Sequence, residues 1–397
     1  MPVNLRELPE QLGSPAFPGK VRWLLVILLC TATGFGLALL FRPDESQTDS
    51  LWFWSRALAL PLVIGVFLYG LRLLAHENRE AYVNGWNSTR ADLESTLIAQ
   101  GQEAIALLAT SYCTAGGSER LAESLRSGSK PLQTVFLPFN GKTMRWSPLL
   151  DPQPLTPEEH ALRVQIWLDR VLAAPALDLE RLFPGQAVRV RIRHNRVVAD
   201  DVLLDLWQSC ARQRALYIES VSVASEDDGL LWLDTWLDQE KAFPLVLSIE
   251  LNLFDKPAAD QAESISAVLL ARSAFCQAQG LQPAAWVHRP VVMSCEPHSL
   301  REVLLWGGVS GDALPFAWQA RVPSALLRDL SRSLAEEGRP LASEASLSLD
   351  ETLGAAGSAV GNIALIVGSE QAAADQQPQL LMVQDGTPQW CVVRPVQ

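Results

Sequence analysis

The chain has few of the residues that build metal and disulfide sites. It contains five histidines and six cysteines among 397 residues, and no two cysteines have C-x-x-C spacing. Zinc sites and redox pairs depend on such spacing, and disulfide scaffolds are short chains dense in cysteine. Cys295-x-x-His298 is half of a zinc pattern, but no second pair follows at metal spacing. We therefore expect no metal, no cofactor and reduced, buried thiols.

Positive charge is also scarce. Lysine and arginine number 32 against 44 acidic residues, so the formal net charge is −12. Binding to nucleic acid needs a basic face toward the phosphates, and this balance excludes a nucleic-acid partner. Charged residues make up only 19% of the chain and hydrophobic ones 48%, which is enough apolar material for a folded core.

The common catalytic motifs are missing as well. There is no H-E-x-x-H, no Walker lysine loop and no G-x-G-x-x-G between a strand and a helix. Gly-Gly-Val-Ser-Gly at 307–311 approaches a nucleophile elbow but lacks the second glycine at the required offset, so we interpret it as a turn. His288 and Arg289 are expected to be structural. The sequence predicts no assembled catalytic set, and hence no enzyme.

What the chain does have is a pair of long apolar stretches near its start. Residues 23–41 carry no charge, and residues 51–74 carry only Arg56 and Arg72, near the ends. At about 1.5 Å per residue, each stretch can cross a hydrocarbon core of roughly 30 Å. A buried core helix is the alternative for each. We predict a transmembrane helical hairpin over 23–74.

Charge around the hairpin predicts its orientation. The linking loop, 42–50, has one basic residue against three acidic ones, whereas basic residues flank the outer ends of both stretches. The positive-inside rule then places the loop in the periplasm and both termini in the cytoplasm. Residues 1–22 become a cytoplasmic segment, and the chain from residue 76 onward a cytoplasmic part.

The cytoplasmic part alternates strand and helix patterns, which is typical of an α/β fold. A helix over about 76–109 and a Gly/Ser-rich stretch at 114–130 form a stalk and linker, 76–130. A charge run before Pro244 divides the rest into α/β domains over 131–240 and 241–397. We find no internal repeat. Strands are expected at 134–137, 187–194, 216–224, 244–252, 264–270 and 284–293, helices at 156–173, 200–212, 230–239, 299–305, 324–337 and 352–366, and a hairpin at 380–394.

Two groups of residues are candidates for binding a partner protein. Arg189, Arg191 and Arg193 alternate with apolar residues and share one face of a strand, which is either a solvated face or a basic patch for an acidic partner. Trp232 and Trp236 are four residues apart on a short amphipathic helix. They either pack in the core or form an aromatic binding face.

The segment from Leu353 to Leu365 carries a resemblance. Its glycines and alanines resemble a helix-start motif of the thiolase and β-ketoacyl synthase superfamily, Gly-His-Thr-Gly-Ala-Ala-Ser. In that alignment Thr352 stands in place of the catalytic histidine and Glu351 in place of the first glycine. Threonine does not titrate near neutral pH, and neither Cys113 nor Cys210 lies in a nucleophile turn. The resemblance implies a thiolase-like fold that has lost its active site.

The whole arrangement resembles the type VI secretion lipase-adaptor family, with an N-terminal hairpin, a tryptophan-rich α/β part and a thiolase-like end. The resemblance implies a non-catalytic protein of the bacterial inner membrane. Its partners would be a phospholipase toxin and a spike protein onto which that effector is loaded. A membrane-associated acyl-transfer enzyme and an immunity protein remain alternatives. The sequence indicates no oligomeric state.

Overall fold

The computed structural model describes residues 3, 5–41, 51–150, 153–174, 183, 185–214, 216–224, 228–239, 243–294, 297–309, 315–336 and 345–396. Contacts divide them into two compact units, Val3–Leu97 and Ile98–Gln397. The expected periplasmic loop, 42–50, and Cys295 lie outside the described residues.

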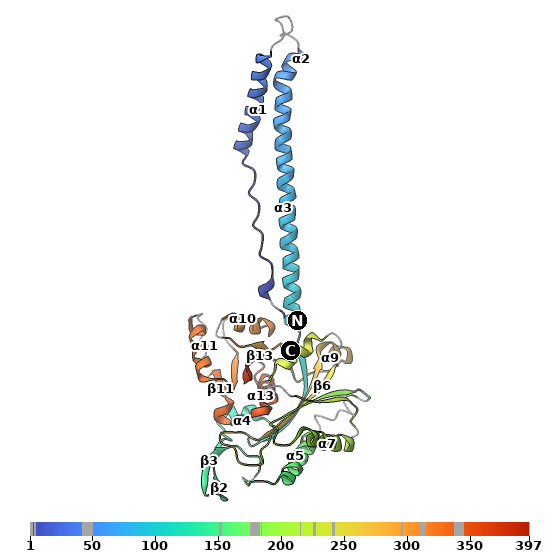
Figure 1. The fold of residues 1–397 in the computed structure, drawn as a ribbon, viewed down its shortest axis with the longest axis vertical. Helices are drawn as coiled ribbons and strands as arrows, with labels where there is room; N and C mark the ends of the chain where they lie inside the picture. Colours follow the sequence, from blue (N-terminus) through green and yellow to red (C-terminus); the bar gives the residue numbers. More distant parts are fainter. Residues whose placement is uncertain are drawn as a thin grey trace. The chain divides into compact units, whose positions relative to one another are not determined.

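The first unit contains the predicted hairpin. Helix α1 (Lys20–Leu40) is followed by α2 (Leu51–Trp54), a π-helical turn (Ser55–Ala59) and α3 (Leu60–Gly101) (Figure 1). Two helical stretches, Lys20–Leu40 and Ser55–Gly101, are long and apolar enough to span a membrane. The second predicted span and the stalk are therefore one continuous helix.

Glycines allow the two hairpin helices to pack closely. A Cβ on Gly34 would lie 2.1 Å from Cγ of Pro61, and one on Gly65 would lie 3.1 Å from Cα of Ile27. Small residues at such crossings are typical of helix pairs in membranes, where close backbone approach replaces the hydrophobic effect.

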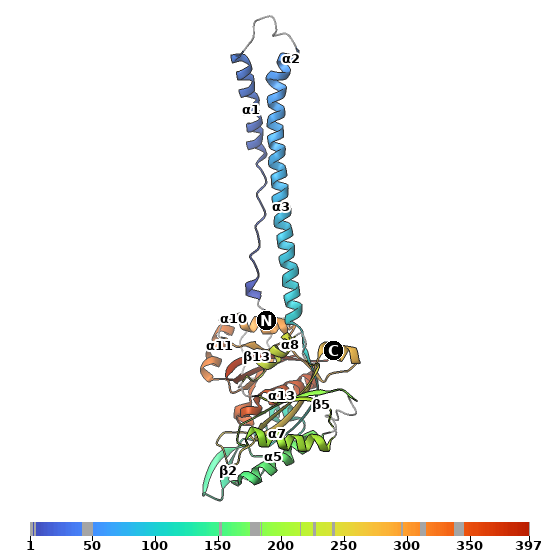
Figure 2. The same cartoon turned by 45° about the vertical axis from the view of Figure 1, so that its right-hand side comes forward.

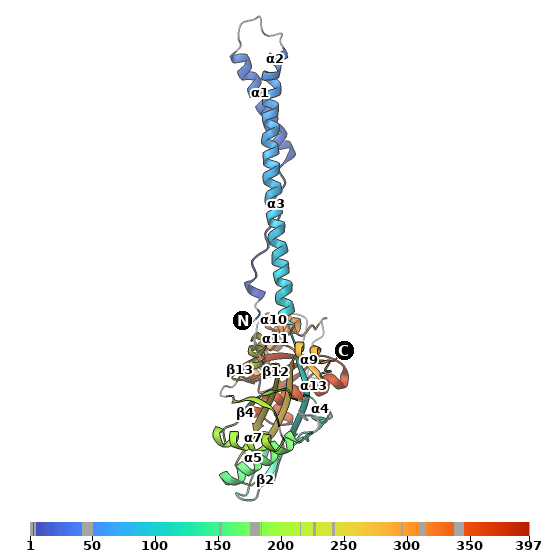
Figure 3. The same ribbon diagram turned by 90° about the vertical axis from the view of Figure 1, so that its right-hand side faces the viewer.

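An extended N-terminal segment lies along α3 (Figures 2 and 3). The Asn87 amide holds the backbone of Leu12 on both sides: Nδ2 donates to the Leu12 carbonyl and Oδ1 accepts from its N–H, each at 3.0 Å. Arg90 Nε donates to the Pro9 carbonyl at 2.7 Å, and Trp86 Nε1 to that of Glu10 at 3.2 Å. These contacts require both segments to lie on the same side of any membrane that the hairpin crosses.

Replacing Asn87 by alanine is expected to release this segment. Two hydrogen bonds worth about 1 kcal/mol each are lost, so cleavage after Glu10 by a glutamate-specific protease should become several-fold faster. Limited proteolysis of the full chain in detergent, followed by mass spectrometry, measures this rate. Asn84→Ala, on the exposed surface of the same helix, is the matched control. Equal rates for the two variants would show that Asn87 does not hold the segment.

The second unit is built on an 11-stranded mixed sheet made of two equivalent halves. Each half has five strands, which can be numbered 1 to 5 in chain order. Their order across the sheet is then 3-2-4-5-1 in both halves, and the same neighbours are parallel or antiparallel. The first half is β1 (Ile105–Thr114), β4 (Val188–His194), β5 (Ile218–Val223), β6 (Leu245–Asn252) and β7 (Ser264–Arg272). The second is β8 (Ala285–Val287), β10 (Phe316–Ala320), β11 (Ser346–Ser348), β12 (Gln379–Asp385) and β13 (Thr387–Pro395).

The duplication is one of strand topology, and no repeat in the sequence accompanies it. The halves join where β1 pairs with β8, Ile105 opposite Val287. The topological division therefore falls between β7 and β8, and the boundary expected near residue 240 lies inside the first half. Strand β9 (Val291–Val292) pairs with β13, and β2 (Gln133–Leu137) and β3 (Lys142–Trp146) form a separate hairpin.

The helices form three layers around the two halves (Figures 1 and 2). Between the halves lie α4 (Leu121–Arg126), α8 (Leu231–Asp238) and α13 (Val360–Asp375), in one continuous core. The outer face of the first half is covered by α5 (Pro157–Leu172), α7 (Asp200–Gln213) and α9 (Ser273–Gln279). The outer face of the second half is covered by α10 (Pro297–Trp306) and α11 (Ser324–Glu336). Helix α13 is apolar around most of its circumference, as a helix buried between two sheets must be.

Several predicted elements are confirmed, and others are wrong for identifiable reasons. The capping box of Thr156 and Glu159 begins α5 as expected. The stretch Ala104–Leu108 was predicted to be helical, but all of it except Ala104 belongs to β1. The prediction failed because a central strand buried on both faces does not alternate apolar and polar residues with a period of two. Residues 114–130 are not only a linker, since they contain α4. The helix expected at 352–366 begins only at Val360, after the short helices α12 (Leu349–Thr352) and Gly357–Ala359. Strands β10 and β11 were not predicted.

Candidate functional site

The N-terminal ends of α8 and α13 meet between the two halves. A Cβ on Gly361, in the first turn of α13, would lie 3.2 Å from the carbonyl oxygen of Gly229, two residues before the start of α8. Glu250 Oε2 accepts a hydrogen bond from the Asn362 N–H at 2.7 Å. A helix N-terminus attracts anions. Here the carboxylate of a buried strand residue occupies that position.

Six charged residues surround this meeting point, and we call them the cross-half network. Arg191 pairs with Asp228 at 2.8 Å and with Glu250 at 3.3 Å. Asp385 pairs with Arg193 and, at 3.2 Å, with Arg321. Three arginines face three carboxylates, so the network is balanced in charge. The side chains of Glu250, Asp385 and Arg193 are 0%, 1% and 4% exposed, and Arg321 at the rim is 40% exposed.

The network follows the duplication. Arg193 lies on β4, the second strand of the first half, and Arg321 directly follows β10, the second strand of the other half. Glu250 and Asp385 lie on the fourth strands, β6 and β12. Because Arg193 and Asp385 come from different halves, their ion pair ties the halves together.

The segment before α8 is anchored on the opposite half. Gly229 N–H donates to Asp385 Oδ2 at 3.1 Å, and Leu230 N–H to Gln389 Oε1 at 2.7 Å. Gly229 has φ +53°, and a Cβ there would lie 2.6 Å from Gln389 Nε2. Only glycine fits this position without displacing the Gln389 amide.

The structure corrects the predicted basic patch. Arg189, Arg191 and Arg193 do share one face of β4, but that face points toward α8 and the interior. Arg191 and Arg193 are buried and are paired with carboxylates, whereas Arg189 is exposed. A surface of three free arginines does not exist, because β4 lies between β5 and β6 with one helix layer on each side.

The structure brings the arginine row and the predicted tryptophans together. The Arg191 guanidinium lies 4.7 Å from the ring centroid of half-buried Trp232, a cation–π contact. Trp232 and Trp236 stack with centroids 6.1 Å apart. Trp236 is 5% exposed and donates from Nε1 to the Phe243 carbonyl at 3.0 Å. Core packing, the first of the two interpretations, is confirmed for Trp236.

The polar side of α8 is also occupied. Arg289 pairs with Asp234 and, at 2.7 Å, with Asp238. This agrees with the structural role expected for Arg289. Sequence reasoning missed these partners because the acids and the arginine lie about 50 positions apart and in different halves.

Burial shifts two acids of the network, Glu250 and Asp228, toward their neutral forms. Desolvation raises the pKa of Glu250 and of Asp228, and the neighbouring Arg191 and Arg193 oppose that rise. With carboxylates and guanidiniums paired, no member is a free acid or base.

None of the described cysteines supplies a nucleophile at this site. Cys113, Cys210, Cys276 and Cys391 are free and buried, and burial raises the pKa of each thiol. The thiolate is the reactive form, so these thiols are inert at neutral pH. Thr352 Oγ1 donates to the Ser348 carbonyl within α12, at 2.9 Å.

No described cysteine or histidine contacts the cross-half network through a hydrogen bond or ion pair. Among the described residues, no group of three or more histidine, cysteine or acidic side chains is arranged to hold a metal ion. Cys295 and the side chain of His298 lie outside the described residues.

The architecture is that of a ketosynthase-like mixed α/β fold. The ketosynthase from module 1 of the bacillaene synthase of Bacillus amyloliquefaciens FZB42 matches with a TM-score of 0.51 and 10% identity, over 75% of this chain and 77% of that one. The module 6 ketosynthase of Bacillus subtilis 168 matches with a TM-score of 0.51 and 12% identity, over 74% and 71%. The oxazolomycin ketosynthase domain KS7 from Streptomyces albus JA3453 has a TM-score of 0.50 and 12% identity, over 74% and 75%.

At these identities the likeness shows the fold alone. No family model matches the chain, and no curated protein matches its sequence. The thiolase-like fold implied by the motif around Gly354 is thus found, while the function has to be argued from the site.

Proposed function

We propose that this protein is a non-catalytic, membrane-anchored adaptor. It binds a cytoplasmic toxin effector, a phospholipase, and helps to load it onto the spike of a type VI secretion machine. Both termini lie on the cytoplasmic side of the bacterial inner membrane. The observation that carries the proposal is the cross-half network, which fills the meeting point of α8 and α13 with paired charges.

An acyl-transfer enzyme needs a nucleophile, a base within reach of it and room for a substrate. Here Glu250 caps α13, Arg191 and Asp228 lie beside it, and the described cysteines of the α/β unit are buried elsewhere. Each buried charge of the network has a partner, so the removal of one partner leaves an uncompensated buried charge. With paired charges in place of catalytic groups, the enzyme-like fold is suited to binding a partner protein.

The helical hairpin is the membrane anchor of the proposed adaptor. Two helices long enough to span a membrane hold the α/β unit near the bilayer. Tethering one partner raises its effective concentration and hence the frequency of encounter, without tighter contacts.

Of the arginines considered for docking, Arg189 is the one available to a partner. It is exposed, with Nε donating to Ser220 Oγ at 3.2 Å and the guanidinium 5.9 Å from the Phe243 ring. A charge at the rim of an interface governs association more than dissociation. We therefore expect Arg189→Glu to lower effector capture several-fold without unfolding the chain.

Full-length chain in detergent, immobilised and exposed to lysate of the source cell, measures this by quantitative mass spectrometry of the captured phospholipase. Arg145→Glu, at an arginine 56% exposed on β3, is the matched control. Failure of the unaltered chain to retain any phospholipase would contradict the adaptor. Equal capture by both variants would exclude only Arg189.

The fold itself favours a second candidate, a membrane-associated acyl-transfer enzyme. Incubating the full chain with acyl-coenzyme A or acyl carrier protein and measuring its intact mass tests this, since a covalent acyl adduct would support the enzyme. An immunity protein differs in the cell. Its loss sensitises the cell to a neighbour's toxin, whereas loss of an adaptor abolishes delivery.

A further inference from the structure

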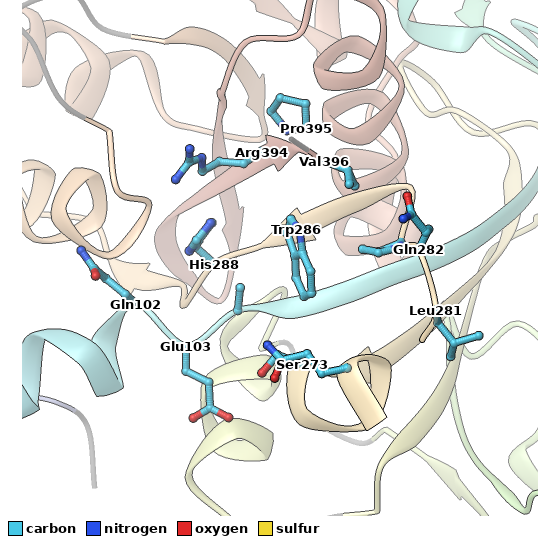
Figure 4. Close-up of a pocket in the computed structure, with 13 residues that line it drawn as sticks. Gln102, Glu103, Ser273, Leu281, Gln282, Trp286, His288, Arg394, Pro395 and Val396 are labelled. Carbon is cyan, nitrogen blue, oxygen red and sulfur yellow. The ribbon is translucent and has the colours of Figure 1, made fainter. Parts of the chain in front are cut away.

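A cavity of about 570 Å³ lies on the outer face of the sheet where the halves join (Figure 4). It is far larger than a single water site and falls in the range of small-molecule pockets, roughly 300–1,000 Å³. Its walls come from the residues just before β1, from α9 and the loop after it, from β8 and the residue after it, and from the end of β13. All of these belong to the unit Ile98–Gln397.

Strand register explains which side chains reach the cavity. Trp286 on β8 lies opposite Arg394 on β13, and directly opposite residues in an antiparallel pair share a face. His288 is two residues beyond Trp286 and points the same way. Val287 and Val393 face the opposite side, into the core between the halves. Figure 4 shows His288 between Arg394 and Trp286, with Gln102 beside it.

One end of the cavity has unsatisfied hydrogen-bonding and charged groups. His288 is 7% exposed, and its Nδ1 atom is shielded from water without a hydrogen-bond partner. The Arg394 guanidinium donates to the Gly307 carbonyl at 3.4 Å, and no carboxylate in the described part of the chain pairs with it. Glu103, the acid in the cavity wall, pairs instead with Arg272 at 3.3 Å.

The rest of the cavity is of mixed character. Trp286 packs against the outer core and lines the cavity with its remaining surface. Leu281 and Pro283 add apolar wall, and Gln277, Gln282 and Ser273 add amide and hydroxyl groups. An indole beside a guanidinium suits a ligand that carries a ring and an anion.

We propose that this cavity binds a small organic anion, with its carboxylate or phosphate held by Arg394 and His288 and its ring against Trp286. The site is distinct from the cross-half network, and it does not depend on the adaptor role.

Binding of such an anion is linked to a proton. Burial, assisted by Arg394, lowers the pKa of His288 to about 4, and the carbonyls of Trp306 and Gln102 act in the opposite direction. The charged groups that line the cavity with His288 are Arg394 on β13 and Glu103 before β1. An anion beside the imidazole raises its pKa, so binding is accompanied by proton uptake between the pKa of the free protein and that of the complex. The affinity for the anion is therefore constant above the pKa that His288 has in the complex. It increases as the pH falls from that value toward the pKa of His288 in the free protein.

The five histidines of the chain make this measurable. Full chain in detergent, labelled at histidine Cε1 with carbon-13, is titrated with 1-naphthoate, with 1-naphthyl phosphate and with the neutral 1-naphthamide. His288→Gln assigns the His288 signal. We expect one or both anions to shift that signal saturably and to raise its apparent pKa by at least one unit, with no effect of the amide.

Arg394→Gln should weaken binding tenfold or more, whereas Arg145→Gln, far along the chain on β3, should leave it unchanged. Saturation by one anion identifies carboxylate or phosphate as the preferred group. The proposal is overturned if neither anion shifts the His288 signal saturably, or if the amide binds as well as the anions. The amide comparison needs no variant, so it holds even if Arg394→Gln does not fold.

Discussion

Replacing Arg193 by alanine is expected to destabilise the α/β unit by about 3–5 kcal/mol, because it leaves a buried carboxylate without its partner. Asp385, that partner, is 1% exposed. Arg321 still contacts its other oxygen, at 3.2 Å, so we expect the lower end of this range. The pair joins the two halves, and its loss should also reduce the cooperativity of unfolding.

Urea unfolding of the full chain in detergent, followed by tryptophan fluorescence, measures this free energy. Arg189→Ala is the matched control. It removes an arginine from the same face of the same strand, but at an exposed position, where changes stay within about 0.5 kcal/mol. Similar midpoints for the two variants would contradict the cross-half network as a stabilising element. The comparison also separates the buried arginines from the one that is free to bind.

Trp236→Ala is expected to cost about 3–5 kcal/mol of unfolding free energy, the usual range for emptying a large aromatic site in a core. Trp236 is 5% exposed and packs with Leu233 and Leu237 between the halves. The variant also leaves the Phe243 carbonyl without its donor. Trp232→Ala, at a half-buried position, should cost less than half as much.

The same unfolding measurement, paired with the effector-capture assay, decides between core and binding face. A Trp236→Ala variant of unaltered stability that no longer captures the effector would show that Trp236 is a binding residue and would contradict its assignment to the core. Reduced stability with proportionate loss of capture is the expected result.

Local patterns in the sequence were reliable wherever the determining partners are close in the chain. The uncharged stretch before Arg42 predicts a membrane-length helix, because crossing a bilayer depends on length and apolarity alone. Thr156 and Glu159 predict the start of α5, because the capping bonds span three residues. The alternation of arginine and valine in 187–194 correctly predicts a strand and the shared face of Arg189, Arg191 and Arg193.

The sequence could not reveal whether that face of the strand is exposed to solvent or buried. Arg191 and Arg193 are interior because Glu250 and Asp385 lie opposite them, 59 and 192 positions away. The segment that follows residue 104 is as apolar as a buried helix, and only its pairing with β7 and β8 shows that it is a strand.

The duplication was hidden for the same reason, since strand order and direction repeat while the residues do not. By itself, the sequence determined the hairpin, most helices and strands of the α/β unit, and the absence of motif-based chemistry. The tertiary structure decided which charges are buried, that the meeting point of α8 and α13 is closed by ion pairs, and where a cavity remains. These properties depend on contacts between distant segments, and no local periodicity encodes such contacts.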